Sequence, residues 1–151
     1  MTIREPMTGW EKRGTLTAPA EALAQFYRAF NGRDLALMEE NWDPSEEAAM
    51  ANPLGSIKRG WTEIREVYRR IFEGRAKVRV EFHDYTLMVV GDVFWAIGRE
   101  RGVSETESRT LELAIRTTRV FRRVNGRWRQ IHRHGSIEPP ELLDAYQRSV
   151  R

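Results

Sequence analysis

The chain has 151 residues, 40% of them hydrophobic and 31% charged, which is typical of one soluble globular domain and excludes a disordered chain. It contains no cysteine, so disulfides, thiolate metal sites and cysteine nucleophiles are excluded. The formal net charge is only +3, and acidic residues stand between most of the basic ones, so the composition does not favour nucleic-acid binding.

The start of the chain predicts neither secretion nor membrane insertion. Residues 1–17 have no hydrophobic core of the kind that a secretory signal needs, and the longest apolar runs of the chain are too short to cross a bilayer. We therefore expect a cytoplasmic protein that does not enter membranes. The same residues lack periodicity and predict an N-terminal arm, with Trp10 as the side chain expected to dock.

Three helices are predicted in the first half of the chain. From Ala18 to Asn31 apolar residues recur at helical spacing, and a shorter helix is expected from Asp34, its cap, to Trp42. Residues 45–59 are irregular and contain a short strand and a turn. A third helix follows, with Thr62 as the expected cap and Gly74 as its end.

After the third helix the apolar pattern changes to alternation, which predicts strands. Helices followed by an antiparallel meander predict an α+β domain, with the helices packed on one face of a curved sheet. A tail of residues 139–151 follows, in which Glu141–Gln147 predict a short helix. The strands are expected at 78–90, 93–101, 109–124 and 127–137.

Arg119 interrupts an apolar row in the third of these strands. Alternate residues of a strand share one face. Burying a guanidinium without a partner costs several kcal/mol or more. Arg119 is therefore expected either to pair with an internal acid, such as Glu100 or Glu112, or to face a polar cavity that admits an anion. Its row consists of Leu111, Leu113, Ile115, Thr117, Arg119 and Phe121.

The preceding strand carries two further arginines, Arg99 and Arg101. Both share a face with Val93, Trp95 and Ile97. One of them, preferably Arg99, is expected at the mouth of the cavity, where it would form an anion clamp with Arg119.

Three motifs resemble the SnoaL-like branch of the nuclear-transport-factor-2-like superfamily. The resemblance covers about residues 20–137 and places the domain at 18–138. It implies a strongly curved antiparallel sheet wrapped around three N-terminal helices, as a cone with an internal pocket. The motifs are Phe30-Asn31-Gly32-Arg33-Asp34, the run from Gly60 to Tyr68, and the final hairpin from Thr118 to Ser136.

Within this superfamily the final hairpin is similar to the association domain of calcium/calmodulin-dependent kinases, in which the arginine matching Arg119 lines the pocket. The third helix is similar to ketosteroid isomerase. The catalytic aspartate of that enzyme corresponds to Asn52, whose amide is not a useful base, and its tyrosine donor corresponds to Phe26. The resemblance therefore argues against ketosteroid isomerase activity, and no catalytic residue is identified.

A small organic or anionic ligand is expected between the helices and the sheet. Neither a metal nor a cofactor is expected, because His132 and His134 share a face without a third ligand nearby. If chemistry occurs, proton transfer on a ketone-like or polycyclic substrate is the expected class, with Arg119 stabilising an oxyanion. The expected ligand-binding residues are Tyr27, Asn52, Trp61, Tyr68, Arg99, Arg119 and Arg133.

The same resemblance implies a homodimer joined through the outer face of the sheet, with the two histidines on that face. Two alternatives stay open. One is a non-catalytic association module that assembles into a ring or senses a ligand. The other is a nucleic-acid binder that uses Arg69-Arg70 and Arg122-Arg123.

Overall fold

The computed structural model describes residues 1–137 and 139–150, so the predicted domain boundary at residue 138 and the last residue of the tail lie outside the described residues. Six strands of the described part form one sheet in the order β2-β1-β6-β5-β4-β3. The elements are α1 (Ala18–Asn31), α2 (Leu35–Asn41), β1 (Ala49–Ala51), β2 (Ile57–Arg59), α3 (Gly60–Glu73), β3 (Lys77–Val90), β4 (Val93–Glu105), β5 (Thr110–Val124), β6 (Arg127–Ser136) and α4 (Pro140–Ser149).

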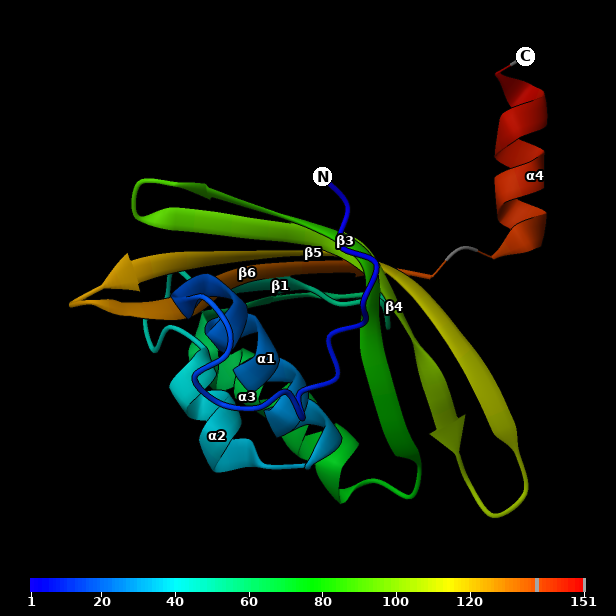
Figure 1. Cartoon of the computed structure of the whole chain (residues 1–151). Coiled ribbons are helices and arrows are strands. Elements are labelled where there is room, and N and C mark those ends of the chain that lie inside the picture. Colours follow the sequence, from blue (N-terminus) through cyan, green and yellow to red (C-terminus); the bar gives the residue numbers. More distant parts are fainter. Residues whose placement is uncertain (138, 151) are drawn as a thin grey trace.

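The predicted α+β architecture is confirmed: a curved sheet wraps around α1, α2 and α3 (Figure 1). All neighbouring strands are antiparallel except β1, which runs parallel to β6. The irregular stretch 45–59 forms the small β1–β2 hairpin, whose turn is closed by a 2.9 Å bond from the N–H of Gly55 to the carbonyl of Asn52. This hairpin extends the sheet beyond the predicted meander.

The sheet bends sharply where β3 contains a bulge between His83 and Thr86 (Figure 1). Asp84 adopts a positive φ of 49° there. On the facing strand a Cβ at Gly98 would lie 2.7 Å from the Cβ of Tyr85, so only glycine fits this crossing. The bend folds one half of the sheet over the helices and forms the wall of the cone.

Helix α1 buries one complete apolar stripe against the sheet, because its apolar residues recur at helical spacing. Helix α3 begins at Gly60, two residues before Thr62, so the prediction that Thr62 caps this helix is wrong. Instead, Glu63 Oε2 accepts a 2.7 Å bond from the N–H of Arg59, and Gly60 enters the helix with a φ of 76°. The buried residues of α1 are Leu23, Ala24, Phe26, Tyr27, Ala29 and Phe30.

The N-terminal arm crosses the edge of the sheet and is anchored by Met7, which is 2% exposed. Trp10, expected to dock, is instead 65% exposed. At the other end, α4 projects from the domain in the tail where a short helix is predicted (Figure 1). None of the helices in the described part of the chain has the length and apolar character needed to span a membrane.

Candidate functional site

A cavity of about 170 Å³ is lined by helices α1 and α3 and by the inner face of the sheet. Most of its wall is apolar. Its polar lining comes from Asn52, Tyr68, Ser104 and the charged side chains described below. The principal apolar contributors are Phe26 and Phe30 from α1, Val67 and Ile71 from α3, and Val80 and Leu113 from the strands.

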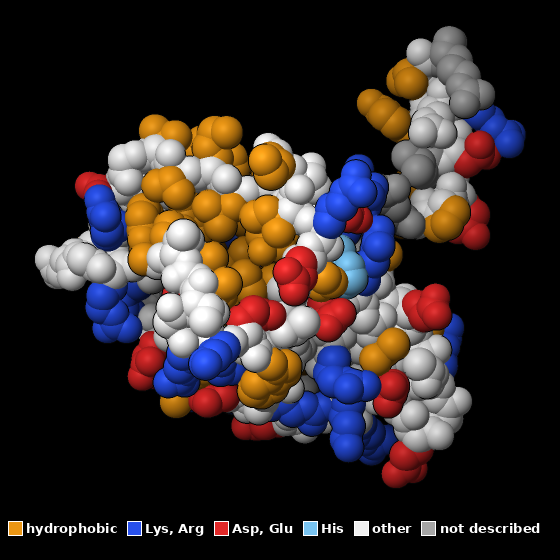
Figure 2. Space-filling view, viewed as in Figure 1, with side chains coloured by type: hydrophobic (Ala, Val, Ile, Leu, Met, Phe, Trp, Pro, Cys, Tyr) orange, Lys and Arg blue, Asp and Glu red, His pale blue; other side chains and the backbone are white. Residues whose placement is uncertain are grey.

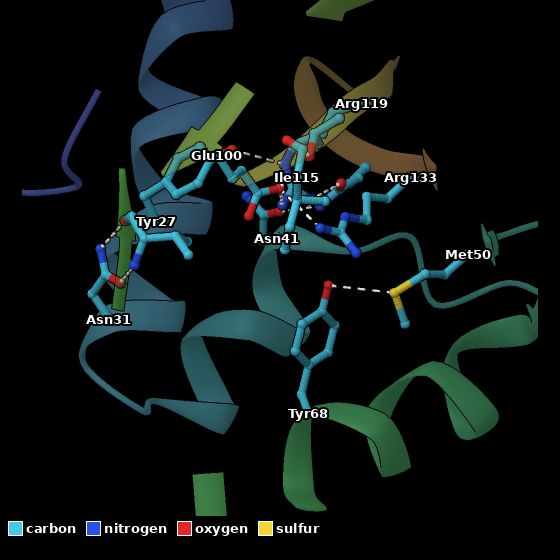
Figure 3. A network of polar contacts seen from close by, with 12 residues as sticks. Tyr27, Asn31, Asn41, Met50, Tyr68, Glu100, Ile115, Arg119 and Arg133 are labelled. Carbon is cyan, nitrogen blue, oxygen red and sulfur yellow. Dashed lines mark hydrogen bonds and ion pairs between the residues drawn. The ribbon is translucent and has the colours of Figure 1, made fainter. Parts of the chain in front are cut away.

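The charged side chains of the cavity form one buried cluster of Glu100, Arg119 and Arg133, from the adjacent strands β4, β5 and β6 (Figure 3). Glu100 Oε1 accepts bonds from Arg119 Nη2 at 3.0 Å and from Arg133 Nη2 at 2.9 Å. Thr117 Oγ1 donates to the same oxygen at 2.8 Å. Two guanidinium charges against one carboxylate charge leave the cluster with a net charge of +1.

Burial alone would raise the pKa of Glu100, but the charges of Arg133 and Arg119 outweigh that effect and hold the pKa below its usual range. Glu100 is only 3% exposed, so little water weakens these attractions. The carboxylate therefore stays ionised at neutral pH and is a poor proton acceptor for a ligand.

Arg119 uses all parts of its guanidinium within the protein. Its Nε donates to the hydroxyl of Tyr27 at 3.2 Å, and its Nη1 donates to Gln130 Oε1 at 2.7 Å. Its Cζ lies 3.4 Å from the centre of the Phe26 ring, where the ring face attracts a cation. With Nη2 on Glu100, each of the three guanidinium nitrogens donates a hydrogen bond within the protein, and Arg119 is 0% exposed.

Arg133 is committed only in part. Its Nη2 contacts Glu100, but its Nε is buried without a hydrogen-bond partner among the described residues. The guanidinium lies flat over Gly135, where a Cβ would approach its Cζ to 2.7 Å. Since a buried donor without a partner costs free energy, Arg133 retains capacity for a further acceptor.

A second layer of polar side chains fixes the cluster from behind. Gln130 Nε2 donates to Asn41 Oδ1 at 3.0 Å, and Asn41 Nδ2 donates to the carbonyl of Ala22 at 2.8 Å. Burial raises the pKa of Tyr27 and keeps its hydroxyl protonated. The hydrogen bonds of this second layer hold the Arg119 side chain in one position.

The sequence pattern missed Gln130 because β6 contains an irregularity. Gln130 pairs with Phe121 and His132 pairs with Val120, so one extra residue, Ile131, stands between them. Simple alternation along residues 127–137 would place Gln130 on the same face as His132 and His134, but this irregularity places it on the opposite face. Gln130 is 0% exposed inside, whereas His134 lines a groove on the outer face.

The structure brings Asn52, Tyr68, Arg119 and Arg133 together around the cavity. Tyr27 lies one layer behind, in contact with Arg119. The ligand role of these residues stays a prediction.

Trp61 and Arg99 do not line the cavity. Trp61 Nε1 donates to Glu39 Oε1 at 3.1 Å. Arg99 lies on the outer face with Ile97, because the inner face of β4 carries the other set of alternating residues, Glu100 among them. The expected clamp of Arg99 with Arg119 is thus replaced by Glu100 and Arg133, and the internal acid pairing considered for Arg119 is present.

Residues 20–140 match the SnoaL-like domain family. The chain belongs to this family. A curated relative of this SnoaL-like chain is the F-box protein SKIP8 of Arabidopsis thaliana, 23% identical over 136 residues, which are 87% of this chain and 55% of the relative. The SnoaL-like chain thus spans about half the length of that protein.

Solved structures, one of them from the NTF2-like family, share the fold of the SnoaL-like chain, in agreement with the predicted resemblance. A proposed dehydratase of the NTF2-like family from Streptomyces avermitilis has a TM-score of 0.73 at 20% identity, over 81% of this chain and 94% of its own. A proposed calcium/calmodulin-dependent protein kinase type II association domain from Thiobacillus denitrificans has a TM-score of 0.65 at 27% identity, over 82% and 96%. A proposed ketosteroid isomerase from Shewanella frigidimarina has a TM-score of 0.64 at 17% identity, over 82% and 98%.

Proposed function

We propose that this SnoaL-like domain binds a small organic anion in the cavity, with the anionic group on Arg133 and the apolar part against the helices. The observation that carries the proposal is the net charge of +1 in a cluster whose members are at most 7% exposed. A buried cation is costly unless it is paired. A bound monoanion would neutralise this cluster.

Among anionic groups, a carboxylate best suits the part of the Arg133 guanidinium that is not bonded to Glu100. Guanidinium groups bind carboxylates through two parallel hydrogen bonds, and such charge-assisted bonds are short and strong. The hydroxyl of Tyr68 now donates to Met50 Sδ at 3.8 Å, a weak bond that a ligand oxygen can replace. Burial raises the pKa of Tyr68, so this hydroxyl remains a donor at neutral pH.

The volume of the cavity limits the size of the ligand. Drug-sized ligands occupy pockets of roughly 300–1,000 Å³, whereas this cavity measures about 170 Å³. That volume favours an acid with one ring or a short chain over the polycyclic ligand considered from the sequence.

Proton-transfer catalysis on a ketone-like substrate is the second candidate, because two structural neighbours are a proposed dehydratase and a proposed ketosteroid isomerase. It would need a base. Among the described residues that line the cavity, Glu100 is the one carboxylate, and its lowered pKa opposes that role. Asn52 Oδ1 accepts a 3.0 Å bond from the N–H of Leu54 and thereby stabilises the turn in which Asn52 lies. We therefore favour binding over this reaction.

We further propose a homodimer through the outer face of the sheet, where Ile97 is 48% exposed and Val93 is 38% exposed. The association-domain name of the Thiobacillus neighbour supports self-assembly and keeps a larger ring as the alternative. Light scattering after size-exclusion chromatography separates a dimer from a ring.

Isothermal titration with benzoate and with its neutral isostere benzamide tests the ligand proposal. We expect benzoate to bind at least about tenfold more tightly, a difference of about 1.4 kcal/mol, because only benzoate neutralises the cluster. Arg133→Met should abolish that preference, while the exposed-face variant Arg99→Met should keep it. Equal binding of benzoate and benzamide, or an unchanged preference in Arg133→Met, would overturn the proposal.

A further inference from the structure

Strand β3 lies at one end of the sheet, and the chain itself closes most of its free edge. Arg33 Nη2 donates to the carbonyl of Ala76 at 2.9 Å. The side chain of Asn31 imitates a neighbouring strand: its Oδ1 accepts from the N–H of Val80 at 2.9 Å, and its Nδ2 donates to the carbonyl of Val80 at 2.8 Å. Unpaired edges attract other strands, and these contacts block that pairing.

The N-terminal arm closes the next part of the edge. Met7 and Phe82 exchange two backbone bonds of 2.9 Å, and the N–H of Ile3 donates to the carbonyl of Tyr85 at 2.7 Å. Both bridges are antiparallel. This edge of β3 therefore already accepts an antiparallel extended segment as far as Tyr85.

Beyond Tyr85 the edge segment Thr86–Val90 is open. Because the orientation of backbone groups alternates along a strand, Leu87 and Val89 direct their N–H and C=O groups to the same free edge as Tyr85. Within residues 1–137 and 139–150 no segment bonds to these four groups. Two of the devices that usually protect an edge are missing here, since the segment contains neither a charged residue nor proline.

The last three side chains of this segment are apolar and exposed, while Thr86 and Leu87 are half-buried. Met88 is 55% exposed, Val89 is 47% exposed and Val90 is 59% exposed. In the space-filling view hydrophobic side chains gather where the β3–β4 hairpin overhangs the helices (Figure 2). An uncharged, apolar edge of this kind favours pairing with another strand.

We propose that the edge segment Thr86–Val90 pairs with the same segment of a second copy, antiparallel, about a two-fold axis at Met88. In this register Leu87 stands opposite the partner's Val89, and Val89 stands opposite the partner's Leu87. Each of these pairs exchanges two hydrogen bonds, so all four open groups of both chains are satisfied. Met88 faces the partner's Met88 across the axis.

A second copy of this chain fits this edge better than a charged strand or a polar peptide does. The segment carries no charge, so two copies do not repel each other. Its apolar side chains meet apolar ones of the second copy, because Leu87 stands opposite Val89 on one face and Met88 stands opposite Met88 on the other. The contact uses the backbone edge of β3 and not the ligand cavity. It differs from the outer-face dimer proposed above, although the side chains of Met88 and Val90 lie on that face opposite Trp95 and Val93.

The absence of cysteine makes disulfide trapping a direct test. In the proposed register the Cα atoms of the two Met88 residues lie about 4.5 Å apart, within the range that a disulfide spans. In the same register the two copies of Thr86 are offset by four residues along the strand direction, so their Cα atoms lie at least about 13 Å apart. We expect Met88→Cys to form a covalent dimer under mild oxidation at least tenfold faster than the matched control Thr86→Cys. Equal rates, or no dimer from Met88→Cys, would overturn the proposal.

A second variant tests the backbone bonds. Proline at position 89 removes an N–H that faces the free edge and not β4, so the sheet tolerates it. Adding Val89→Pro to Met88→Cys should abolish the covalent dimer, whereas adding Ile97→Lys on the outer face should leave its rate unchanged. Persistent trapping with Val89→Pro, or its loss with Ile97→Lys, contradicts pairing through this edge.

Discussion

The two arginines of the buried cluster differ in how completely the protein satisfies them. Arg119 bonds to Glu100, Gln130 and Tyr27 and lies over an aromatic ring. Arg133, one strand away, shares only Glu100 and keeps a buried Nε without a partner among the described residues. The protein's own groups thus satisfy Arg119 more completely, which leaves Arg133 better suited than Arg119 to hold a ligand.

Removing the carboxylate that both arginines share should have the largest effect. Glu100→Gln leaves two buried guanidinium groups without a counter-charge, and losing one member of a buried pair costs roughly 3–5 kcal/mol. Urea unfolding measures the change. The exposed acid Glu112 on the neighbouring strand provides the control, since Glu112→Gln should change stability by less than about 0.5 kcal/mol. A loss as small as that of the control would show that the cluster is not strongly coupled.

The same carboxylate should make stability depend on acidity. Because its folded pKa lies below the ordinary value of 4.5, Glu100 contributes stability above pH 4.5 and loses it as the pH falls through the folded pKa. The difference in unfolding free energy between wild type and Glu100→Gln should therefore shrink in acid. Unfolding curves recorded from about pH 2.5 to about pH 7 measure this difference. A difference that does not depend on pH would mean that Glu100 does not titrate as described.

Displacing Arg133 without removing it should have an intermediate effect. Gly135→Ala places a Cβ within 2.8 Å of the Arg133 Nη1, so the flexible guanidinium must move while the backbone stays. We expect benzoate affinity to fall about tenfold, or about 1.4 kcal/mol, with a smaller change in stability. Titration calorimetry measures the affinity, with Ser136→Ala next to it as the control. Unchanged affinity would separate Arg133 from the ligand.

The smallest effect is expected at Tyr68. Tyr68→Phe removes a hydroxyl whose bond to Met50 Sδ is weak, so stability should change by less than about 1 kcal/mol. Benzoate affinity should fall only a few-fold, because Arg133 supplies the charge. If this variant abolished binding, Tyr68 and not Arg133 would dominate recognition.

The sequence predicted the inner face of β5 because this strand has no internal irregularity. Ile115, Thr117, Arg119 and Phe121 alternate strictly and are all buried. The inner face of β4 was harder to predict, since both of its alternating sets contain apolar residues. The acid Glu100 lies inside, whereas Arg99 lies outside.

Features that depend on tertiary contacts were less accessible. The extra residue in β6 reverses the face of Gln130, and no local propensity marks it. The short strands β1 and β2 are held by pairing with β6 and with each other, so their own sequence carries little signal. Family resemblance predicted the cone. The sequence named Glu100 as one possible partner of Arg119, whereas Tyr27, Gln130 and the bond from Arg133 to Glu100 were found only in the structure.

The most direct test compares Arg119→Met with Arg133→Met in urea unfolding. Arg119→Met removes bonds that Tyr27 and Gln130 cannot replace, whereas Arg133→Met leaves Glu100 paired with Arg119 in a neutral cluster. We expect Arg119→Met to lose at least about 2 kcal/mol more unfolding free energy than Arg133→Met. Equal losses, or a larger loss in Arg133→Met, would contradict this expectation.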